Sequence, residues 1–420
     1  MPLAFGMISA NRREMHRKWL LDVTQLPTAA GREGRVLEYI RSWGKARAGL
    51  TVTADASGNL VVSMKDAKGT DLPPVYITAH LDHPAFVVER IVSPSCVELS
   101  FRGGVMDDYF KDAKVTVWSS TDTKHHATLT GEASAAPVNG SESPFKHYTA
   151  ELSDTNDTTE GLKVGDVAVW DLPPAEILNG ILHTCACDDL AAVAAALAAM
   201  DVIEENKETA RDVRLIFTRA EEIGFIGAIA ACRDGTMPKN SVVIALENSR
   251  SFPHDSPIGG GPIVRVGDRI SIFSPSLTEA IAKCAEALAG GPSTPHAKDK
   301  VDKSRKWKWQ RKLMAGGACE ASVFCAAGYD ATCVCLPLGN YHNMGDLAAV
   351  QEGTNTRRAT IEREQIAISD FEGLVDLLVA CAQDPRIAGQ NPLGPGLKPS
   401  GAVGPLVEKL WRERAFVLKG

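Results

Sequence analysis

The spacing of apolar residues changes twice along the chain, and each change marks a different kind of structure. Apolar positions recur at helical spacing over 31–49, alternate with polar ones over 50–65, and run together over 73–80. These patterns predict a helix, a hairpin and a short buried strand. From about 84 to 175, short alternating segments are separated by turn residues, which predicts a small all-β module.

After residue 180, helical patterns and apolar strands alternate. The predicted helices cover 187–205, 224–235, 277–291, 320–328 and 361–383. The predicted strands cover 212–218, 241–249, 306–314 and 331–339. Strands that alternate with helices favour a mostly parallel sheet covered on both faces. The predicted fold class is therefore α/β, a mostly parallel sheet flanked by helices with an inserted small β-barrel-like domain.

These changes of pattern divide the chain into four parts. The sheet domain is predicted to be built from residues 1–83 and 179–384, and the β module, residues 84–178, interrupts it. Residues 385–420 are rich in proline and glycine, so they are expected to form a tail on the surface.

Composition and charge narrow the range of partners. The 420 residues carry a formal net charge of −7 at pH 7, which gives no reason to expect nucleic acid or an anionic membrane as a partner. Residues 298–312 are strongly basic; a solvated strand and loop is the favoured interpretation, and an RNA-contacting patch is the weaker alternative. No run of about 18 apolar residues is present, so no membrane span is expected. The N-terminal stretch also lacks the apolar core and cleavage site of a secretory signal.

The ten cysteines show no spacing typical of a disulfide framework. Cys185 and Cys187 form one C-x-C pair in an apolar stretch, and Cys333 and Cys335 form another. They are expected to be reduced, buried thiols of a cytoplasmic protein. A structural zinc site built from both pairs is the alternative, although C-x-C is weaker evidence than C-x-x-C.

A set of titratable side chains stands where predicted strands end or the following helices begin. They are His80, Asp188, Glu221, Glu222, Glu247 and His342. Taken singly, most have an ordinary explanation, because acidic residues that open a helix commonly cap it. Ligands gather at the carboxyl ends of strands in open α/β sheets, so these side chains are expected to converge in one crevice. Imidazoles and carboxylates in one crevice predict a divalent metal centre.

The ligand types favour zinc, with cobalt or manganese as alternatives. A ligand set with one shared carboxylate would hold two metal ions roughly 3.5–4 Å apart. Glu221 and Glu222 are then expected to have different roles, because the side chains of two adjacent residues that follow a strand point in different directions. One is expected to bind metal, while the other takes a proton from metal-activated water.

Two neighbours of His80 have expected supporting roles. Asp82 is placed to accept a hydrogen bond from the His80 imidazole and to hold it in the metal-binding orientation. His83 either lines the site or belongs to a wall beside it. His125 and His126, in the β module, are expected to face solvent.

Several short motifs follow one another in the order seen in the co-catalytic zinc metallopeptidases. They are AHLDH, CDDLAAV, RAEEIGFIGA, LENS and GNYHN. Within that clan the chain resembles the tetrahedral, or deblocking, aminopeptidase family. The β module lies where that family has its dimerisation domain, and VGDVAVWD and IGGGPIVRVGD resemble family segments. The resemblance runs from about residue 20 to 383.

The resemblance implies a role for each of these residues. It implies Glu221 as the general base, and Asp188 as the carboxylate that bridges two metal ions, with a cis peptide to Asp189. The remaining metal ligands that it implies are His80, Glu222, Glu247 and His342. It also implies hydrolysis of N-terminal residues from short peptides, and dimers that can build a hollow dodecamer.

Two departures from the family pattern leave the substrate open. Glu247 stands where aspartate is common, and Cys319 and Glu320 stand for the threonine and aspartate of a GGTDA motif. The main hypothesis is a cytoplasmic, dinuclear metal-dependent aminopeptidase. A related metal-dependent amidohydrolase or deacylase acting on small N-acyl compounds is the first alternative. A non-catalytic assembly protein of the same fold is the second.

Overall fold

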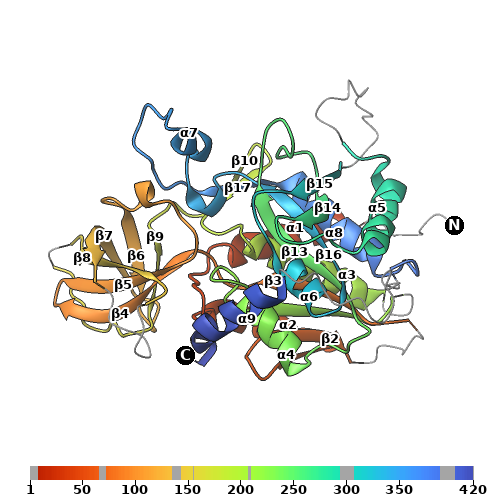
Figure 1. Ribbon diagram of the computed structural model, residues 1–420, viewed down its shortest axis with the longest axis horizontal. Helices are drawn as coiled ribbons and strands as arrows, with labels where there is room; N and C mark the ends of the chain where they lie inside the picture. The colour runs from red at the N-terminus through yellow and green to blue at the C-terminus, as the bar shows by residue number, and fades with distance from the viewer. Residues whose placement is uncertain are drawn as a thin grey trace.

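A large mixed sheet and a closed barrel form the two main β structures of the chain (Figure 1). The computed structural model describes residues 8–65, 72–134, 143–154, 156–206, 210–293, 307–387 and 403–419. Among these residues, no helix has the length and apolar content needed to span a bilayer.

The large sheet has eight strands, and its centre is parallel. In spatial order they are β1 (Leu50–Ala54), β2 (Leu60–Met64), β12 (Val213–Thr218), β3 (Val75–His80), β13 (Val242–Arg250), β16 (Asp330–Leu338), β14 (Ile263–Asp268) and β15 (Gln310–Met314). Strands β12, β3, β13 and β16 run parallel to one another. The hairpin β1–β2 and strand β14 join antiparallel on either side. The predicted fold class, a mostly parallel sheet with helices, is confirmed.

Helices cover both faces of this sheet because its central strands are apolar on both sides. One face packs on α1 (Ala10–Val23), α2 (Gly34–Lys45), α3 (Leu190–Glu205), α5 (Pro275–Ala289) and α8 (Ile368–Cys381). The other packs on α4 (Ile226–Asp234), α6 (Glu320–Ala326) and α9 (Val403–Arg414). Helix α3 is apolar almost all round and lies inside the first layer, between the sheet and the helices α1 and α8.

The barrel lies at one end of the molecule (Figure 1, orange and yellow). Its strands close in the order β4 (Ala85–Ser93), β5 (Cys96–Arg102), β8 (Lys146–Leu152), β7 (Lys124–Ala133), β6 (Lys114–Trp118) and β9 (Val167–Trp170). Aromatic rings fill it: Phe110 stacks on Tyr148 at 4.6 Å between ring centroids, and Phe86 meets Trp170 edge-on at 4.8 Å. The predicted β-barrel-like insertion is therefore present, and it leaves the sheet domain directly after β3.

A third, small antiparallel sheet joins β10 (Glu176–Leu178), β11 (Ile181–Thr184) and β17 (Glu364–Ala367). The helix predicted over 361–383 is wrong in its first part, because β17 pairs with β11 before α8 begins at Ile368. Between β16 and β17 lie the one-turn helix η2 (Tyr341–Asn343) and the helix α7 (Leu347–Glu352). A short helix η1 (Asp107–Tyr109) precedes β6 in the barrel.

The N-terminal helix α1 was not predicted, because its first part, residues 10–18, is mostly polar; ion pairs attach that part, while Leu20 and Val23 pack into the core. The pairs are Arg12–Asp201, Arg13–Asp376 and Arg17–Glu372, with N···O distances of 2.7, 2.9 and 2.7 Å. Within the predicted tail, residues 403–419 form α9 and η3 (Ala415–Lys419), which pack against the sheet domain. Residues 388–402 lie outside the described residues.

Several smaller expectations are tested as well. The predicted strand 306–314 is confined to β15, and its neighbours Trp307 and Trp309 are buried. Residues 298–306 of the basic stretch lie outside the described residues. The expectation that His125 faces solvent is wrong, because it is buried and its Nδ1 lies 2.9 Å from Asp157. All ten cysteines are free, and none of the candidate metal-ligand groups in the described part of the chain includes one.

Candidate metal centre

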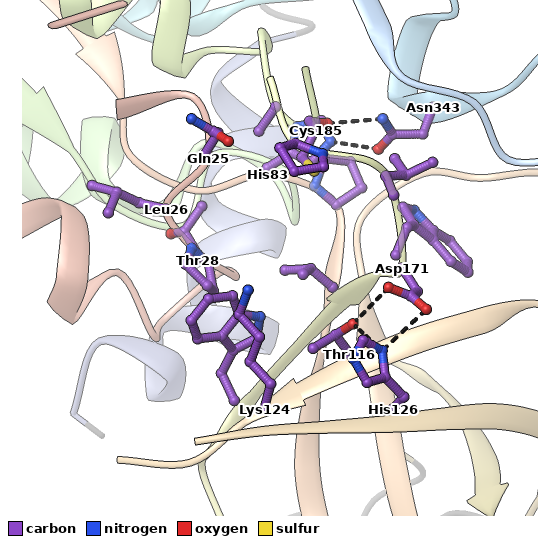
Figure 2. A pocket seen from close by; sticks show the side chains of 18 residues that line it. Gln25, Leu26, Thr28, His83, Thr116, Lys124, His126, Asp171, Cys185 and Asn343 are labelled. Atoms are coloured by element: carbon purple, nitrogen blue, oxygen red, sulfur yellow. Dashed lines mark hydrogen bonds and ion pairs between the residues drawn. The ribbon is translucent and has the colours of Figure 1, made fainter. Parts of the chain in front are cut away.

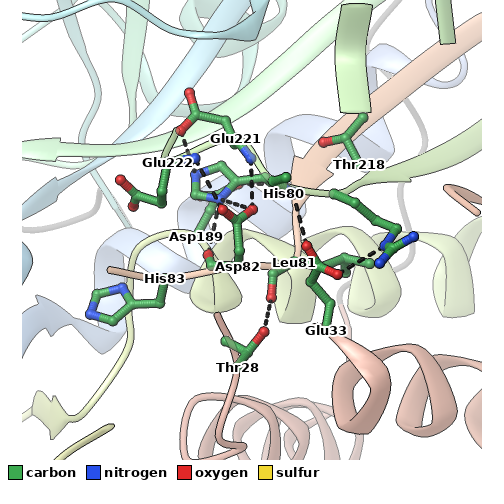
Figure 3. Close-up of polar contacts among 12 residues, drawn as sticks. Thr28, Glu33, His80, Leu81, Asp82, His83, Asp189, Thr218, Glu221 and Glu222 are labelled. Atoms are coloured by element: carbon green, nitrogen blue, oxygen red, sulfur yellow. Dashed lines mark hydrogen bonds and ion pairs between the residues drawn. The ribbon is translucent and has the colours of Figure 1, made fainter. Parts of the chain in front are cut away.

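The carboxyl ends of four adjacent parallel strands bring the predicted site residues to one edge of the large sheet. His80 ends β3, the pair Glu221–Glu222 lies in the turn after β12, and Glu247 lies in β13. His342 lies in η2, just after β16, and Asp188 precedes α3. Figure 3 shows His80, Asp82 and the glutamate pair converging from separate segments. The expected convergence is thus present.

The side chains form two groups that share Asp188. In the first, His80 Nε2 lies 3.4 Å from Asp188 Oδ1 and 3.7 Å from Glu247 Oε1. In the second, His342 Nε2 lies 3.4 Å from Asp188 Oδ2 and 3.5 Å from Glu222 Oε1. Each oxygen of Asp188 therefore faces a different imidazole. The peptide bond between Asp188 and Asp189 is cis, as the resemblance implies.

Buried atoms in these groups lack partners. His80 Nε2, Asp188 Oδ1 and Glu222 Oε1 are buried and have no hydrogen-bond partner in the described part of the chain. Buried polar atoms in proteins are almost always paired, so atoms without partners that face one another indicate a ligand between them. Carboxylate and imidazole are the donors that a divalent metal such as zinc accepts. The residues present therefore fit a metal ion in each group.

The electrostatics of the cluster also favour cations. Burial, with repulsion from neighbouring carboxylates, raises the pKa of Glu221 and Glu222 well above the usual range and that of Glu247 to about 8. Burial disfavours protonation of His80, but Glu221 and Asp188 together raise its pKa well above its usual value. Negative charge is thus in excess at this edge, and bound cations would keep the carboxylates ionised.

Asp82 holds the turn that carries the glutamate pair. Its carboxylate accepts hydrogen bonds from the backbone N–H of Glu221 at 2.8 Å and of Glu222 at 3.0 Å (Figure 3). His80 Nδ1 lies 3.1 Å from the backbone carbonyl of Asp82 and 3.6 Å from its carboxylate. The expected contact between Asp82 and the imidazole therefore runs mainly through the backbone, and the carboxylate fixes the turn instead.

The turn is held from behind by a second buried carboxylate. Glu33 accepts hydrogen bonds from the backbone N–H of Ala220 at 3.0 Å and of Gly31 at 2.7 Å. It also pairs with Arg219, with 2.8 Å between Glu33 Oε2 and Arg219 Nε. Sequence reasoning missed Glu33, because a single glutamate at the start of a helix has many ordinary explanations.

Glu364 is a further residue that sequence reasoning missed. It is fully buried, and one oxygen accepts hydrogen bonds from the backbone N–H of Cys187 at 2.7 Å and of Asp188 at 3.0 Å. The other oxygen accepts from the backbone N–H of His342 at 2.8 Å. One carboxylate therefore fixes the backbone of two predicted metal ligands. The signal in the sequence was a glutamate at a position of β17 that alternation predicts to be buried.

A cavity of about 420 Å³ opens from the metal-ligand cluster. Asp188, Glu221, Glu222, Glu247 and His342 line one end of it. Three cationic side chains also line it: Arg250, Arg265 and Lys312. Cys319 and Glu320 are buried and are not among its lining residues, so these departures from the family motif act from behind the cavity wall.

Arg265 is the most buried of these cations. Its Nε lies 2.8 Å from the sulfur of Cys335. Burial raises the pKa of a thiol, but contacts with Cys333 and Arg265 lower that of Cys335 to about 6. Lys312 pairs with Asp255 at 2.6 Å, and Arg250 is hydrogen-bonded to Gln351. The cavity lining thus contains the acidic residues of the cluster and these three cations, named here the cationic wall, with Asp255 beside Lys312.

A second cavity, of about 280 Å³, lies where the barrel meets the sheet domain (Figure 2). His83 lines it, and the ring connects to the cluster through Nδ1, 2.5 Å from the backbone carbonyl of Asp188. His83 Nε2 lies 2.9 Å from Asn343 Oδ1. Burial lowers the pKa of His83. Of the two expectations for His83, the structure agrees with a wall residue.

An α/β sheet with carboxylates and imidazoles gathered at its carboxyl edge is typical of metal-dependent hydrolases. A model of the M42 glutamyl aminopeptidase family matches residues 58–289. The match spans over half of the chain, so the chain belongs to this family of metal-dependent aminopeptidases. The predicted resemblance and the prediction of a metallo-aminopeptidase are confirmed.

Several proteins are similar to this chain in fold or in sequence. A TET aminopeptidase from a marine sediment archaeon, Thaumarchaeota archaeon SCGC AB-539-E09, is 17% identical with a TM-score of 0.68, covering 89% of this chain and 99% of its own. An aminopeptidase from Desulfurococcus kamchatkensis is 20% identical with a TM-score of 0.67, covering 89% and 97%. A protein of Acetivibrio thermocellus, named provisionally as an aminopeptidase, is 21% identical over 74% of this chain and 87% of its own length.

Proposed function

We propose that the chain is a dinuclear metal-dependent aminopeptidase that removes N-terminal residues from short peptides. The observation that carries the proposal is the pair of ligand groups that share Asp188, with buried atoms of both groups lacking partners. His80 and Glu247 would hold one ion, His342 and Glu222 the other. Zinc is the first choice for this ligand set, and cobalt or manganese are substitutes.

The residues of the chain divide the chemistry between them. Divalent ions bound here would supply Lewis-acid activation of water and of the scissile carbonyl. Glu221 takes the proton from the attacking water and returns it to the leaving amine. Its carboxylate lies 3.9 Å from His80 Nε2 and lines the cavity, and the Asp82 carboxylate fixes its backbone. Burial raises its pKa, which suits a group that accepts a proton and gives it back.

The cationic wall supports an acidic N-terminal residue as the preferred substrate. Arg265 is buried and lines the cavity, and a planar guanidinium at this place is a suitable partner for a substrate carboxylate. The matching family is named for glutamyl aminopeptidases. Glutamyl and leucyl 4-nitroanilides should then differ in kcat/KM by about tenfold or more, and Arg265→Met should remove that difference.

The test of the reaction compares the two neighbouring glutamates. Glu221→Gln should keep its metal and lose about 10²- to 10⁴-fold in kcat on an amino-acid anilide. Glu222→Gln, the matched control, should lose metal as well, as should Asp188→Ala and His80→Ala. Metal content by elemental analysis separates the two classes. Near-normal turnover by Glu221→Gln would refute the assigned base.

A second candidate function changes the substrate and keeps the metal chemistry. Glu247 stands where aspartate is common, and the cationic wall could equally hold the carboxylate of an N-acyl amino acid. A metal-dependent deacylase would hydrolyse such a compound faster than an amino-acid anilide. Assay of both compounds with the same metal-loaded protein decides between the candidates.

The proposal also includes assembly. The inserted β domain, residues 84–178, is expected to join copies of the chain into a homo-oligomer. The TET1 peptidase of Pyrococcus horikoshii can assemble into a tetrahedron or a large octahedral shell. That protein is 21% identical with a TM-score of 0.65, and covers 87% of this chain and 99% of its own. The assembly is expected to range from a dimer to a dodecamer. The expected compartment is the cytoplasm. Light scattering on the eluting protein measures the assembly.

A further inference from the structure

The C-terminal segment folds back onto the turn that carries Glu221 and Glu222. Residues 403–419, named here the C-terminal latch, consist of helix α9 and the short helix η3. Figure 1 shows α9 in dark blue beside α4, which begins directly after that turn. Val407, Leu410, Trp411 and Arg414 recur at helical spacing and are its half-buried face.

The latch contacts the turn at several points. The Arg414 guanidinium donates a hydrogen bond to the backbone carbonyl of Ile223. Leu410 lies over Gly224 so closely that a Cβ added there would be 2.7 Å from Leu410 Cδ2. Further along, Arg219 Nη1 donates to the backbone carbonyl of Leu418 at 3.4 Å. These contacts span both ends of the glutamate pair.

An apolar cluster also joins the latch to the turn. It contains Ala30, Ala220, Ile223, Ile226 and Val417, with Leu410, Trp411, Phe416 and Leu418 packed against it. Members before and after Glu221 and Glu222 in the sequence therefore bury side chains against the latch. Phe416 also meets Phe145 next to barrel strand β8, with 6.2 Å between ring centroids, so the latch touches both domains.

The turn is a segment that needs support from its surroundings. Ala220 and Phe225 have φ values of 56° and 62°, in the left-handed region that non-glycine residues rarely occupy. Such backbone persists when neighbouring groups over-determine it. Asp82 and Glu33 hold the turn from within the sheet domain. The latch supplies the matching contacts from outside.

We propose that the C-terminal latch is a positioning element for Glu221. It fixes the turn of residues 219–226 so that the Glu221 carboxylate stays in the cavity, facing His80. In the contacts described, the latch touches none of the predicted ligands outside the turn, His80, Asp188, Glu247 or His342. Glu222 lies in the turn itself, so loss of the latch would also weaken binding of the ion that Glu222 shares with Asp188 and His342, and the effect on Glu221 is read as turnover at saturating metal. The inference rests on the proposed role of Glu221 as the base.

Deletion of residues 403–420 tests the proposal. At saturating metal, the deletion variant should lose about 10- to 100-fold in kcat with KM unchanged, as expected for a catalytic group displaced by about an ångström. A synthetic peptide of residues 403–419 should restore kcat in a saturable way, because a short amphipathic helix gains its stability from packing. The same peptide with Leu410→Asp should not.

Point variants keep the test valid if the deletion variant does not fold. Arg414→Gln and Leu410→Ala remove contacts with the turn and should each lower kcat. Glu408→Gln is the control, because Glu408 binds Arg233 of α4 at 2.6 Å and does not contact the turn in the bonds described. It should leave kcat unchanged. Unchanged kcat in Arg414→Gln and Leu410→Ala, or full recovery of kcat when metal is made saturating, would overturn the proposal.

Hydrogen exchange separates this inference from the proposed function. Deletion of the latch should speed exchange of the backbone amides of residues 221–226 and leave β13 protected. Unchanged exchange in the turn would refute the latch whether or not the chain cleaves peptides. Faster exchange in a chain whose intact form cleaves no peptide would refute the proposed function, and with it the catalytic purpose of the latch.

Discussion

Buried charge is arranged in opposite ways in the barrel and at the carboxyl edge of the large sheet. In the barrel, Glu98 lies between His147 at 2.9 Å and Arg90 at 2.6 Å, so its charge is matched. His125 is likewise paired with Asp157. At the sheet edge, the carboxylates outnumber the imidazoles, and buried oxygens and a ring nitrogen face one another without hydrogen bonds.

The difference separates structural from functional burial of charge. Burial of an ion costs several kcal/mol unless a partner compensates it, and the β module supplies these partners from its own strands and from the loop that carries Asp157. At the sheet edge, the buried carboxylates in excess of the imidazoles can be compensated by a bound cation. Burial alone would have marked both regions as candidate sites. Buried charge that lacks a partner marks only the sheet edge as a candidate site.

Removal of the metal should give the largest effect. Burial raises the pKa of Glu247 to about 8, above the value of about 4.3 for an exposed glutamate. A raised carboxyl pKa stabilises the fold at low pH, and that contribution disappears as pH rises from about 4.3 to 8. Chelated protein should therefore lose up to about 5 kcal/mol of stability over this range. Thermal melts with and without chelator measure it, and a metal-free Tm that is flat with pH would contradict it.

Glu364→Gln should weaken metal binding about 10- to 100-fold. Glutamine has one acceptor oxygen, so its amide N–H₂ would face a backbone N–H on either the Asp188 side or the His342 side. Competition with a metal indicator measures the dissociation constant. Glu362→Gln, a nearby exposed control, should bind metal normally. Equal affinities in the two variants would show that Glu364 does not position the ligands.

Glu98→Gln should destabilise the barrel by about 1–3 kcal/mol and leave metal binding unchanged. The substitution removes the negative charge that His147 and Arg90 share. Denaturant unfolding gives the stability, and elemental analysis gives the metal content. Loss of metal in this variant would show that the two regions do not manage their charges independently.

Asp201→Asn should have the smallest effect, about 1–2 kcal/mol at neutral pH. Burial opposes ionisation of Asp201, but contacts with His16, Arg12 and Arg47 lower its pKa to about 2. A lowered carboxyl pKa stabilises the fold above about pH 4, and the gain is lost as pH falls towards 2. The two proteins should therefore differ in Tm at pH 7 and converge near pH 2. Asp22→Asn, which breaks the exposed pair with Lys18, should change little.

Local patterns in the sequence predicted which side chains converge at the sheet edge. Apolar runs that end in His80, Glu247 and the glutamate pair encode both the strands and the chemistry at their ends. Parallel pairing of neighbouring strands then brings those ends together without further information. The mostly parallel sheet and the inserted barrel could be predicted for the same reason, because each strand carries its own pattern.

The missed features depend on partners distant in sequence. Strand β17 exists because it pairs with β11, about 180 residues earlier, and its pattern merges with that of α8. Helix α1 is held by arginines whose partners lie on α3 and α8. The C-terminal latch has a regular apolar spacing, but the proline and glycine content of the preceding residues hid it.

The insertion of the barrel after β3 has a consequence for how the chain becomes native during synthesis. All of the barrel strands lie between Ala85 and Trp170, so that unit can close soon after the ribosome releases it. Strand β3 must wait, because both of its neighbours, β12 and β13, are translated later. Until then the backbone groups on its two edges are unpaired and its side chains, mostly apolar, are uncovered, which makes this stage of biogenesis the one most open to mispairing and to capture by chaperones.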